Sequence, residues 1–187
     1  VILWAREDDV ISSVNGSHEN SVFLPGVSLH KNIQATSDIR ALLKSDIILL
    51  VAPTQFIRAT LAPIKDELKK IPIVICSKGV EIESGQLPSQ IVEDILPGHP
   101  IAVLTGPTFA IEVARGQPAA VTLASNDKNL AENLQKILGS KTFRAYVSTD
   151  MIGAQLGAAI KNVIAIACGI AHGKGLGENA RAALITR

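Results

Sequence analysis

Short apolar segments alternate with segments of helical periodicity along most of this chain. The apolar segments carry few polar side chains at alternate positions, which is typical of strands that helices cover on both faces. We therefore expect an α/β fold, a doubly wound parallel sheet whose strands are joined by helices through right-handed crossovers. The expected strands are residues 1–5, 46–52, 71–77, 100–105 and 118–124, with an edge strand at 143–148. The helical patterns between them are residues 54–70, 86–96, 108–116 and 127–140.

The pattern changes after Thr149, beyond which no strand is indicated. From Asp150 the sequence predicts one long helix, a glycine-rich link and the start of another helix, with Thr149 or Asp150 as the N-cap. We expect two domains, a Rossmann-like dinucleotide-binding sheet at 1–149 and the start of an all-α domain at 150–187. The glycine-rich turn GxGxxG of dinucleotide-binding sheets is absent, so the sheet is expected to lack its first strand.

The composition is that of a globular protein close to charge neutrality. Hydrophobic residues make up 47% of the 187 residues and the formal net charge is +1, so no strong field favours nucleic acid or a membrane surface as partner. Cys76 and Cys168 lie in apolar segments without a CxxC pair or a Cys/His cluster, which favours a reduced, cytoplasmic setting and no metal site. Because the chain starts without Met and stops within a helical pattern, we expect a piece of a longer protein.

Residues 151–173 are long and apolar enough to span a membrane, but Lys161 lies near their centre. A central lysine costs about 2.5–3.5 kcal/mol on insertion scales, so a buried core helix and no membrane span are expected. A poorly solvated lysine gives up its proton more readily, which makes Lys161 a candidate acid/base; a salt-bridged or snorkelling lysine is the alternative. Small residues share its helix face and leave room for a ligand: Gly153, Gly157, Ala165 and Cys168.

Three further candidates follow expected strands, at the carboxyl edge where doubly wound sheets bind ligands. Arg6 ends the first strand and suits the 2′-phosphate of a cofactor, although two acidic residues follow it and a solvated charge cluster is the alternative. Lys78 follows the third strand and suits a phosphate or a carbonyl oxygen, unless it is an ordinary surface lysine. Gly106 lets a ligand approach the backbone, and the N–H groups beyond Pro107 are free to face that ligand. The alternative is that residues 105–108 form a plain strand-to-helix turn.

Six segments are distinctive when taken together. They are LWAR at 3–6, FLPG at 23–26, VAPTQFIR at 51–58, SKGVE at 77–81, GPTFAIEVARGQP at 106–118 and GAAIKNVIAIACGIAHGKGLGENARAALITR at 157–187. In this combination the chain resembles the NAD(P)-dependent glycerol-3-phosphate dehydrogenases, most closely those of bacterial type. The resemblance covers nearly the whole chain, and its last two segments are the most specific.

The resemblance implies an enzyme that interconverts dihydroxyacetone phosphate and sn-glycerol 3-phosphate with NADPH or NADH and feeds glycerophospholipid synthesis. It implies that Lys161 is the catalytic acid/base and that Arg6 favours NADPH. The implied substrate-binding residues are Lys78, Gly106, Thr108 and Asn162, and the implied cofactor-binding residues are Arg6, Lys78 and Ala110. The family's glycine-rich first turn is missing here. The later part of its helical domain, which would supply a carboxylate and an Arg-Asn pair for the substrate phosphate, is missing too, so this piece alone is not expected to catalyse.

Two other functions stay open at this point. A 3-hydroxyacid or 6-phosphogluconate dehydrogenase also places a lysine on the first helix after its dinucleotide domain, but the GPTFA and GLGEN segments argue against it. A non-catalytic nucleotide-binding module would keep the fold without the chemistry, and the presence of both Lys78 and Lys161 argues against it. The glycine-rich link at 173–179 lacks a Walker pattern and is expected to join two helices. A homodimer is left open.

Overall fold

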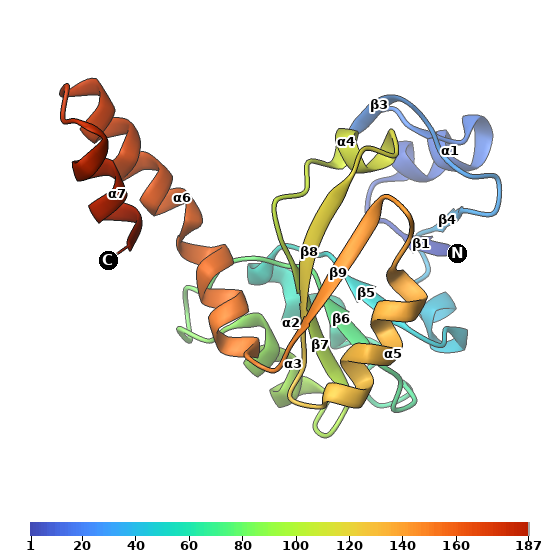
Figure 1. Cartoon of the computed structure of the whole chain (residues 1–187). Coiled ribbons are helices and arrows are strands. Elements are labelled where there is room, and N and C mark those ends of the chain that lie inside the picture. The colour runs from blue at the N-terminus through green and yellow to red at the C-terminus, as the bar shows by residue number, and fades with distance from the viewer. Residues whose placement is uncertain (187) are drawn as a thin grey trace.

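A five-stranded sheet forms the centre of the protein in the computed structural model, which describes residues 1–186 (Figure 1). Its strands, in spatial order, are β5 (Ile48–Leu50), β6 (Ile73–Ile75), β7 (Ile101–Thr105), β8 (Ala119–Ala124) and β9 (Phe143–Ser148). The first three are parallel neighbours, as the sequence predicts for these segments. β9 pairs with β8 alone and takes the predicted edge position.

Helices cover both faces of this sheet, so the predicted doubly wound arrangement is confirmed. On one face, Ile73 and Ile75 of β6 pack with the apolar side chains of two helices, and on the other face Val74 packs with a third. Successive side chains of a strand point to opposite faces, so β6 contributes to both cores and all of its residues are buried. The two helices are α2 (Ile57–Leu61) and α3 (Pro88–Ile95), and the third is α5 (Lys128–Leu138).

The strand predicted at the start of the chain belongs to a separate small sheet. β1 (Ile2–Trp4) pairs in parallel with β4 (Gln34–Thr36), and α1 (Asp8–Ser17) packs against this pair. Between them lies a hairpin that the sequence analysis missed, β2 (Glu19–Asn20) with β3 (Leu24–Ser28). In the doubly wound order the first strand lies between the second and the fourth. A chain that lacks this first strand is therefore expected to form two separate sheets, as this one does.

Two expectations about the connections are wrong. β8 runs antiparallel to β7, because the intervening α4 (Ala110–Ala114) is only five residues long and lies beside β3 instead of crossing the sheet as a βαβ unit requires. The helix expected over 54–70 is also shorter. It consists of the 3₁₀ turn η2 (Thr54–Phe56) and α2, which ends before Pro63 because a proline ring is incompatible with a continuing helix. A second 3₁₀ segment, η1 (Ile39–Lys44), follows β4.

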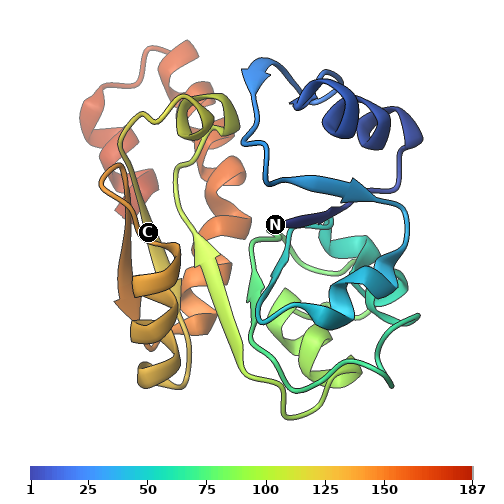
Figure 2. The ribbon, with the colours of Figure 1, turned by 90° about the vertical axis from the view of Figure 1, so that its right-hand side faces the viewer.

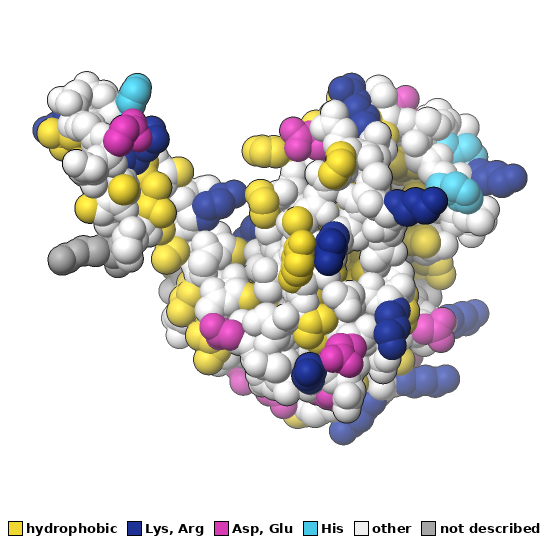
Figure 3. Space-filling view, viewed as in Figure 1, with side chains coloured by type: hydrophobic (Ala, Val, Ile, Leu, Met, Phe, Trp, Pro, Cys, Tyr) yellow, Lys and Arg dark blue, Asp and Glu magenta, His cyan; other side chains and the backbone are white. Residues whose placement is uncertain are grey.

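The long helix α6 (Met151–Gly173) is present as predicted, but the expectation that it is a buried core helix is wrong for this chain. Its first turns pack against β7 and β8, and beyond them it leaves the body and packs mainly against α7 (Glu178–Thr186) (Figures 1 and 2). Only 11% of its most apolar window is buried, although its length and composition would suffice to cross a membrane. Apolar side chains therefore lie exposed along this arm (Figure 3), among them Ile160, Val163, Ile166 and Ile170.

One buried amide ties α6 to the body. The Ser89 backbone N–H donates to Gln155 Oε1 (2.9 Å), and Gln155 Nε2 donates to the Ser89 hydroxyl (2.8 Å) and to the Met151 carbonyl (2.9 Å). Gln155 is only 3% exposed, so water cannot take the place of its amide as the hydrogen-bond partner of these groups. The start of α6 is set in addition by Asp150, whose side chain caps the Gly153 N–H at 2.7 Å, as the sequence predicts for one of two cap candidates.

We predict that Gln155→Leu destabilises the protein by about 1–3 kcal/mol, because it leaves the buried Ser89 N–H without an acceptor. Urea unfolding followed by circular dichroism measures this free energy. Gln117→Leu is the matched control, since Gln117 is exposed in a loop and its side-chain amide makes no hydrogen bond among residues 1–186. Equal stability of the two variants would show that the amide does not hold α6.

Candidate active site

Two of the predicted loops leave the sheet at the same edge. β6 and β7 are parallel neighbours, so the segments that follow them, with Lys78 and Thr108, emerge together at the carboxyl edge. Lys78 is exposed, whereas the preceding Ser77 is buried and donates its hydroxyl to the Ala52 carbonyl at 2.5 Å. The lysine side chain thus lies at the surface, while the residue before it is tied to the segment that follows β5.

Residues 77–82, which we call the Lys78 loop, are held by side chains of η2. The buried Thr54 hydroxyl donates to the Lys78 carbonyl at 2.8 Å. Gln55 Nε2 donates to the Val80 carbonyl at 2.8 Å, and Gln55 Oε1 accepts from the Ile82 N–H at 3.0 Å. Every second residue of the loop is therefore bonded through its backbone.

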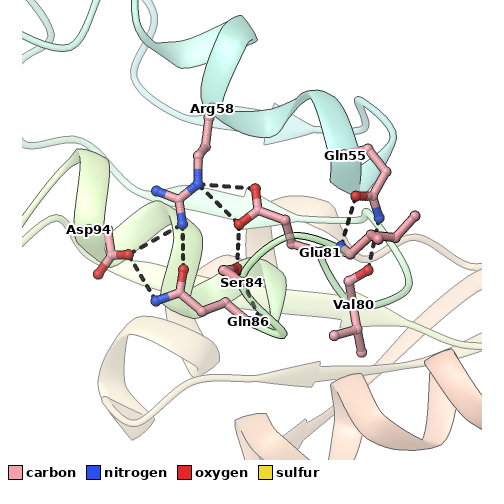
Figure 4. A network of polar contacts seen from close by, with 8 residues as sticks. Gln55, Arg58, Val80, Glu81, Ser84, Gln86 and Asp94 are labelled. Atoms are coloured by element: carbon pink, nitrogen blue, oxygen red, sulfur yellow. Dashed lines mark hydrogen bonds and ion pairs between the residues drawn. The ribbon is translucent and has the colours of Figure 1, made fainter.

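A network around Arg58 fixes the far end of the loop (Figure 4). Arg58 Nε lies 3.0 and 3.1 Å from the two carboxylate oxygens of Glu81, and its terminal nitrogen reaches Gln86 and Asp94. The Ser84 hydroxyl also donates to Glu81. The Ser84 hydroxyl and then the Arg58 guanidinium hold the pKa of the Glu81 carboxyl below its usual value, and the Glu81 carboxylate raises the pKa of Arg58. Sequence analysis missed these roles, although both segments follow expected strands.

The loop after β7 approaches the neighbouring strand closely. A Cβ atom on Gly106 would lie 3.0 Å from the Ala120 carbonyl oxygen and 3.0 Å from Val121, a close approach that disfavours a side chain at this position. Packing against β8 is thus one reason for this glycine, and the ligand approach proposed for it stays a prediction. Thr108 is half-buried, and Ala110 is exposed as the first residue of α4.

Lys161 and Asn162 lie together on the exposed part of α6. The burial that motivated Lys161 as an acid/base is absent, because this part of the helix lies beyond the sheet. No hydrogen bond or ion pair of the Lys161 side chain occurs within residues 1–186, so the salt-bridged alternative is not supported either. Helix geometry puts Lys161 about 9 Å farther along α6 than Gln155.

One of the small residues on the Lys161 face, Gly153, has a more local explanation than a ligand. A Cβ on Gly153 would lie 2.1 Å from Asp150 Oδ2, so this glycine makes room for the capping carboxylate. A Cβ on Gly157 would meet nothing within 4 Å, so no neighbour in the described chain requires glycine at that position.

The remaining candidates are spread out. Arg6 is exposed after β1 and forms no ion pair in the part of the chain that the structure describes. Cys76 packs at the second core, and burial raises the pKa of its thiol to about 11, so its predicted role as core filler holds. Cys168 is half-buried, and both thiols are free. Residues 1–186 contain no group of three His, Cys, Asp or Glu side chains suited to a metal.

The structure thus joins some candidates and leaves others apart. It brings Lys78 and the 105–108 turn to one edge, and it places Lys161 on the helix that starts beside β7. Within the described residues, no hydrogen bond or ion pair joins the side chains of Lys161 or Arg6 to that edge. Two surface hollows, one lined by residues between 135 and 145 and one between α1 and β4, include none of the predicted site residues. The link at 173–179 joins α6 to α7, as predicted.

Two family models match the chain. The model for the N-terminus of NAD-dependent glycerol-3-phosphate dehydrogenase matches residues 1–131, and the model for its C-terminus matches residues 150–187. The glycerol-3-phosphate dehydrogenase [NAD(P)+] of Parvibaculum lavamentivorans is 50% identical over the whole chain, which spans 56% of that relative's length. The one of Paramagnetospirillum magneticum is also 50% identical, and there the chain spans 68%.

Solved structures agree with these matches. The glycerol-3-phosphate dehydrogenase of Coxiella burnetii has a TM-score of 0.88 and 37% identity, and the match covers all of this chain and 57% of that one. The enzyme of Saccharomyces cerevisiae has a TM-score of 0.87 and 28% identity, with 98% and 57% covered. A pyrroline-5-carboxylate reductase of Coxiella burnetii, with a TM-score of 0.61 and 16% identity, shares the fold alone.

The Arg58 network generates a prediction about acid stability. Because the folded-state pKa of Glu81 is lowered, its carboxylate adds stability that is complete above the unfolded-state pKa of about 4.3 and is lost as the pH falls through the lower folded value. Glu81→Gln is therefore expected to flatten the fall in unfolding free energy below about pH 4.3. Urea titrations between neutral pH and the acid limb measure the slope. Glu83→Gln, an exposed neighbour, is the control, and an unchanged slope in Glu81→Gln would contradict the pairing.

Proposed function

Because the chain belongs to the NAD-dependent glycerol-3-phosphate dehydrogenase family, we propose that the complete protein interconverts dihydroxyacetone phosphate and sn-glycerol 3-phosphate. The cofactor is NADPH or NADH, and the product serves glycerophospholipid synthesis. The family match over residues 1–131 and 150–187 carries this proposal. The chain spans just over half the length of several relatives, so the activity is proposed for the protein at full length.

The residues present fit such a cofactor in outline. The fold offers the carboxyl edge of β5, β6 and β7, and Arg6 and Lys78 present exposed cations without an ion pair among the described residues. In this proposal Arg6 lies near the adenosine ribose, and Lys78 and Ala110 contact the cofactor. A nicotinamide cofactor supplies the hydride when it is bound.

The proposed roles toward the substrate follow from charge and hydrogen bonding. The Lys78 ammonium attracts the substrate, and Gly106, Thr108 and Asn162 orient it. The Lys161 ammonium hydrogen-bonds the carbonyl oxygen and gives it a proton as the carbonyl carbon is reduced, so no free alkoxide forms. In the reverse direction the neutral Lys161 amine takes the proton from the hydroxyl. To act as an acid/base, Lys161 needs a less solvated environment, which this exposed stretch of α6 does not itself provide.

The setting proposed is the cytoplasm, and the partners are the phosphate substrate and the cofactor. Two free cysteines and a net charge of +1 support a reduced compartment and argue against nucleic acid. The central Lys161 argues against a membrane span for α6. The division into domains at residue 149 falls between the end of β9 and the start of α6 and stays a proposal.

The direct test is the oxidation of NADPH by the complete protein in the presence of dihydroxyacetone phosphate, followed by absorbance. A 3-hydroxyacid and 6-phosphogluconate are the comparison substrates. Turnover of either of these in place of dihydroxyacetone phosphate would replace the proposal with one of the alternatives.

In the complete protein, Lys161→Met is expected to lower kcat by roughly 10²–10⁴-fold, because methionine keeps the apolar stem but has no proton to transfer. Steady-state kinetics measure kcat, and circular dichroism with urea unfolding checks that the variant folds with at least the parent's stability. Lys141→Met, an exposed lysine near the start of β9, is the control. A nearly normal kcat in Lys161→Met would leave Lys161 a structural residue.

Arg6→Asp is expected to erode a preference for NADPH, because a carboxylate suits the ribose 2′-hydroxyl and repels a 2′-phosphate. The measured quantity is the ratio of kcat/KM for NADPH to that for NADH in the complete protein. Arg6→Lys keeps the charge and should retain most of the preference. If the parent shows no preference for NADPH, the role given to Arg6 is wrong.

A further inference from the structure

We propose that Thr54, Gln55 and Arg58 form a positioning clamp that sets the place of Lys78. The inference rests on the proposed function, because it concerns how that lysine meets the substrate phosphate. None of the three side chains is assigned a contact with substrate or cofactor. Thr54 and Gln55 act through the backbone of the Lys78 loop, and Arg58 acts through the Glu81 side chain.

The first observation is the contrast between the Lys78 side chain and its backbone. The side chain is exposed and has no hydrogen bond or ion pair among residues 1–186. Its carbonyl accepts from the Thr54 hydroxyl at 2.8 Å, and Thr54 is 4% exposed. Nothing but the backbone therefore fixes where the ammonium can reach within the described chain.

The second observation is the regular spacing of the clamp. Thr54 binds residue 78, Gln55 binds the carbonyl of residue 80 and the N–H of residue 82, and Arg58 binds the side chain of residue 81. The three come from one continuous stretch, η2 and the first turn of α2. A single rigid turn thus holds the whole loop, as Figure 4 shows for Gln55 and Arg58.

The third observation is the conformation between the anchors. Gly79 has a φ of +116°, which other residues rarely adopt, and a Cβ there would lie 3.7 Å from the Thr54 hydroxyl oxygen. Gly79 lets the chain turn between the bonded residues 78 and 80. The loop therefore has one defined path, which requires both the glycine and the Thr54 hydroxyl.

The fourth observation is where the clamp ends. Arg58 and Gln86 both bond Asp94 of α3, at 3.4 and 2.9 Å, so the loop is joined to that helix. The same helix carries Ser89, which bonds Gln155 of α6. The segment between Lys78 and α3 is thus connected by side-chain bonds to the helix that bears Lys161.

The primary test compares Thr54→Val with Thr54→Ser in the complete protein. Valine matches threonine in shape but cannot donate to the Lys78 carbonyl, whereas serine keeps the hydroxyl. A contact to the substrate phosphate that is equally strong in the ground state and the transition state affects KM and not kcat. Thr54→Val should therefore raise KM for dihydroxyacetone phosphate roughly 5–10-fold, while kcat stays within about twofold of the parent value. Thr54→Ser should stay within about twofold of the parent in both values.

Amide hydrogen exchange supplies a readout that needs no substrate. Arg58→Met and Gln55→Ala should accelerate exchange of the N–H groups in residues 80–82 at least roughly tenfold, because they remove bonds that hold the loop. Arg40→Met is the matched control, since Arg40 forms an exposed pair with Glu67 at 3.0 Å, and it should leave this exchange unchanged.

The outcomes separate the two proposals. If the parent does not turn over dihydroxyacetone phosphate, the proposed function fails, and exchange alone decides whether the loop is clamped. If the parent is active but Thr54→Val leaves KM unchanged, the clamp does not position Lys78. If Thr54→Ser is as impaired as Thr54→Val, the hydroxyl is not the cause, and the proposal is overturned.

Discussion

The burial of β6 on both faces is the constraint on which the rest of the structure depends. Ile73, Val74 and Ile75 are all fully buried, with side chains in two different cores. A strand of this kind lies inside a sheet, between two parallel neighbours, with helices packed on both faces of the sheet. Its position brings the segments after β5, β6 and β7 to one edge, and the Lys78 loop begins there because the buried strand ends there.

At this edge polar side chains hold the chain in place through hydrogen bonds, whereas in the cores apolar side chains do so by packing. The loops cannot bury enough apolar surface to hold themselves, so their backbone groups are bonded by Thr54, Gln55 and Ser77, and Glu81 is held by Arg58 and Ser84. Buried polar groups of this kind need partners, since each one left without a partner carries a desolvation cost. The same reasoning explains Gln155, whose amide joins α3 to α6 where an apolar side chain would leave the Ser89 N–H unpaired.

Sequence reasoning predicted which segments form strands of the sheet. It could not predict features that depend on which other segments lie beside them. The apolar segment at 71–77 became β6, which is buried on both faces as expected, whereas β5 in the segment at 46–52 is buried on one face only, with Leu49 50% exposed on the other. The direction of β8 was not predictable from its own apolar pattern, since that pattern is the same in parallel and antiparallel strands. The Arg58 network joins residues far apart in sequence, so only the fold could reveal it.

The sequence by itself determined the fold class, the presence of α6 and the candidate residue types, such as a lysine after a buried strand, because periodicity and side-chain chemistry are local properties. The tertiary structure decided the rest. It showed that α6 leaves the body after its first turns, where Gln155 and its neighbours pack against the sheet and α3. It also showed that Gly153 leaves room for a capping carboxylate and that Gly106 lies close to the backbone of β8. Sequence spacing does not specify these neighbours, which set the free space around each Cα.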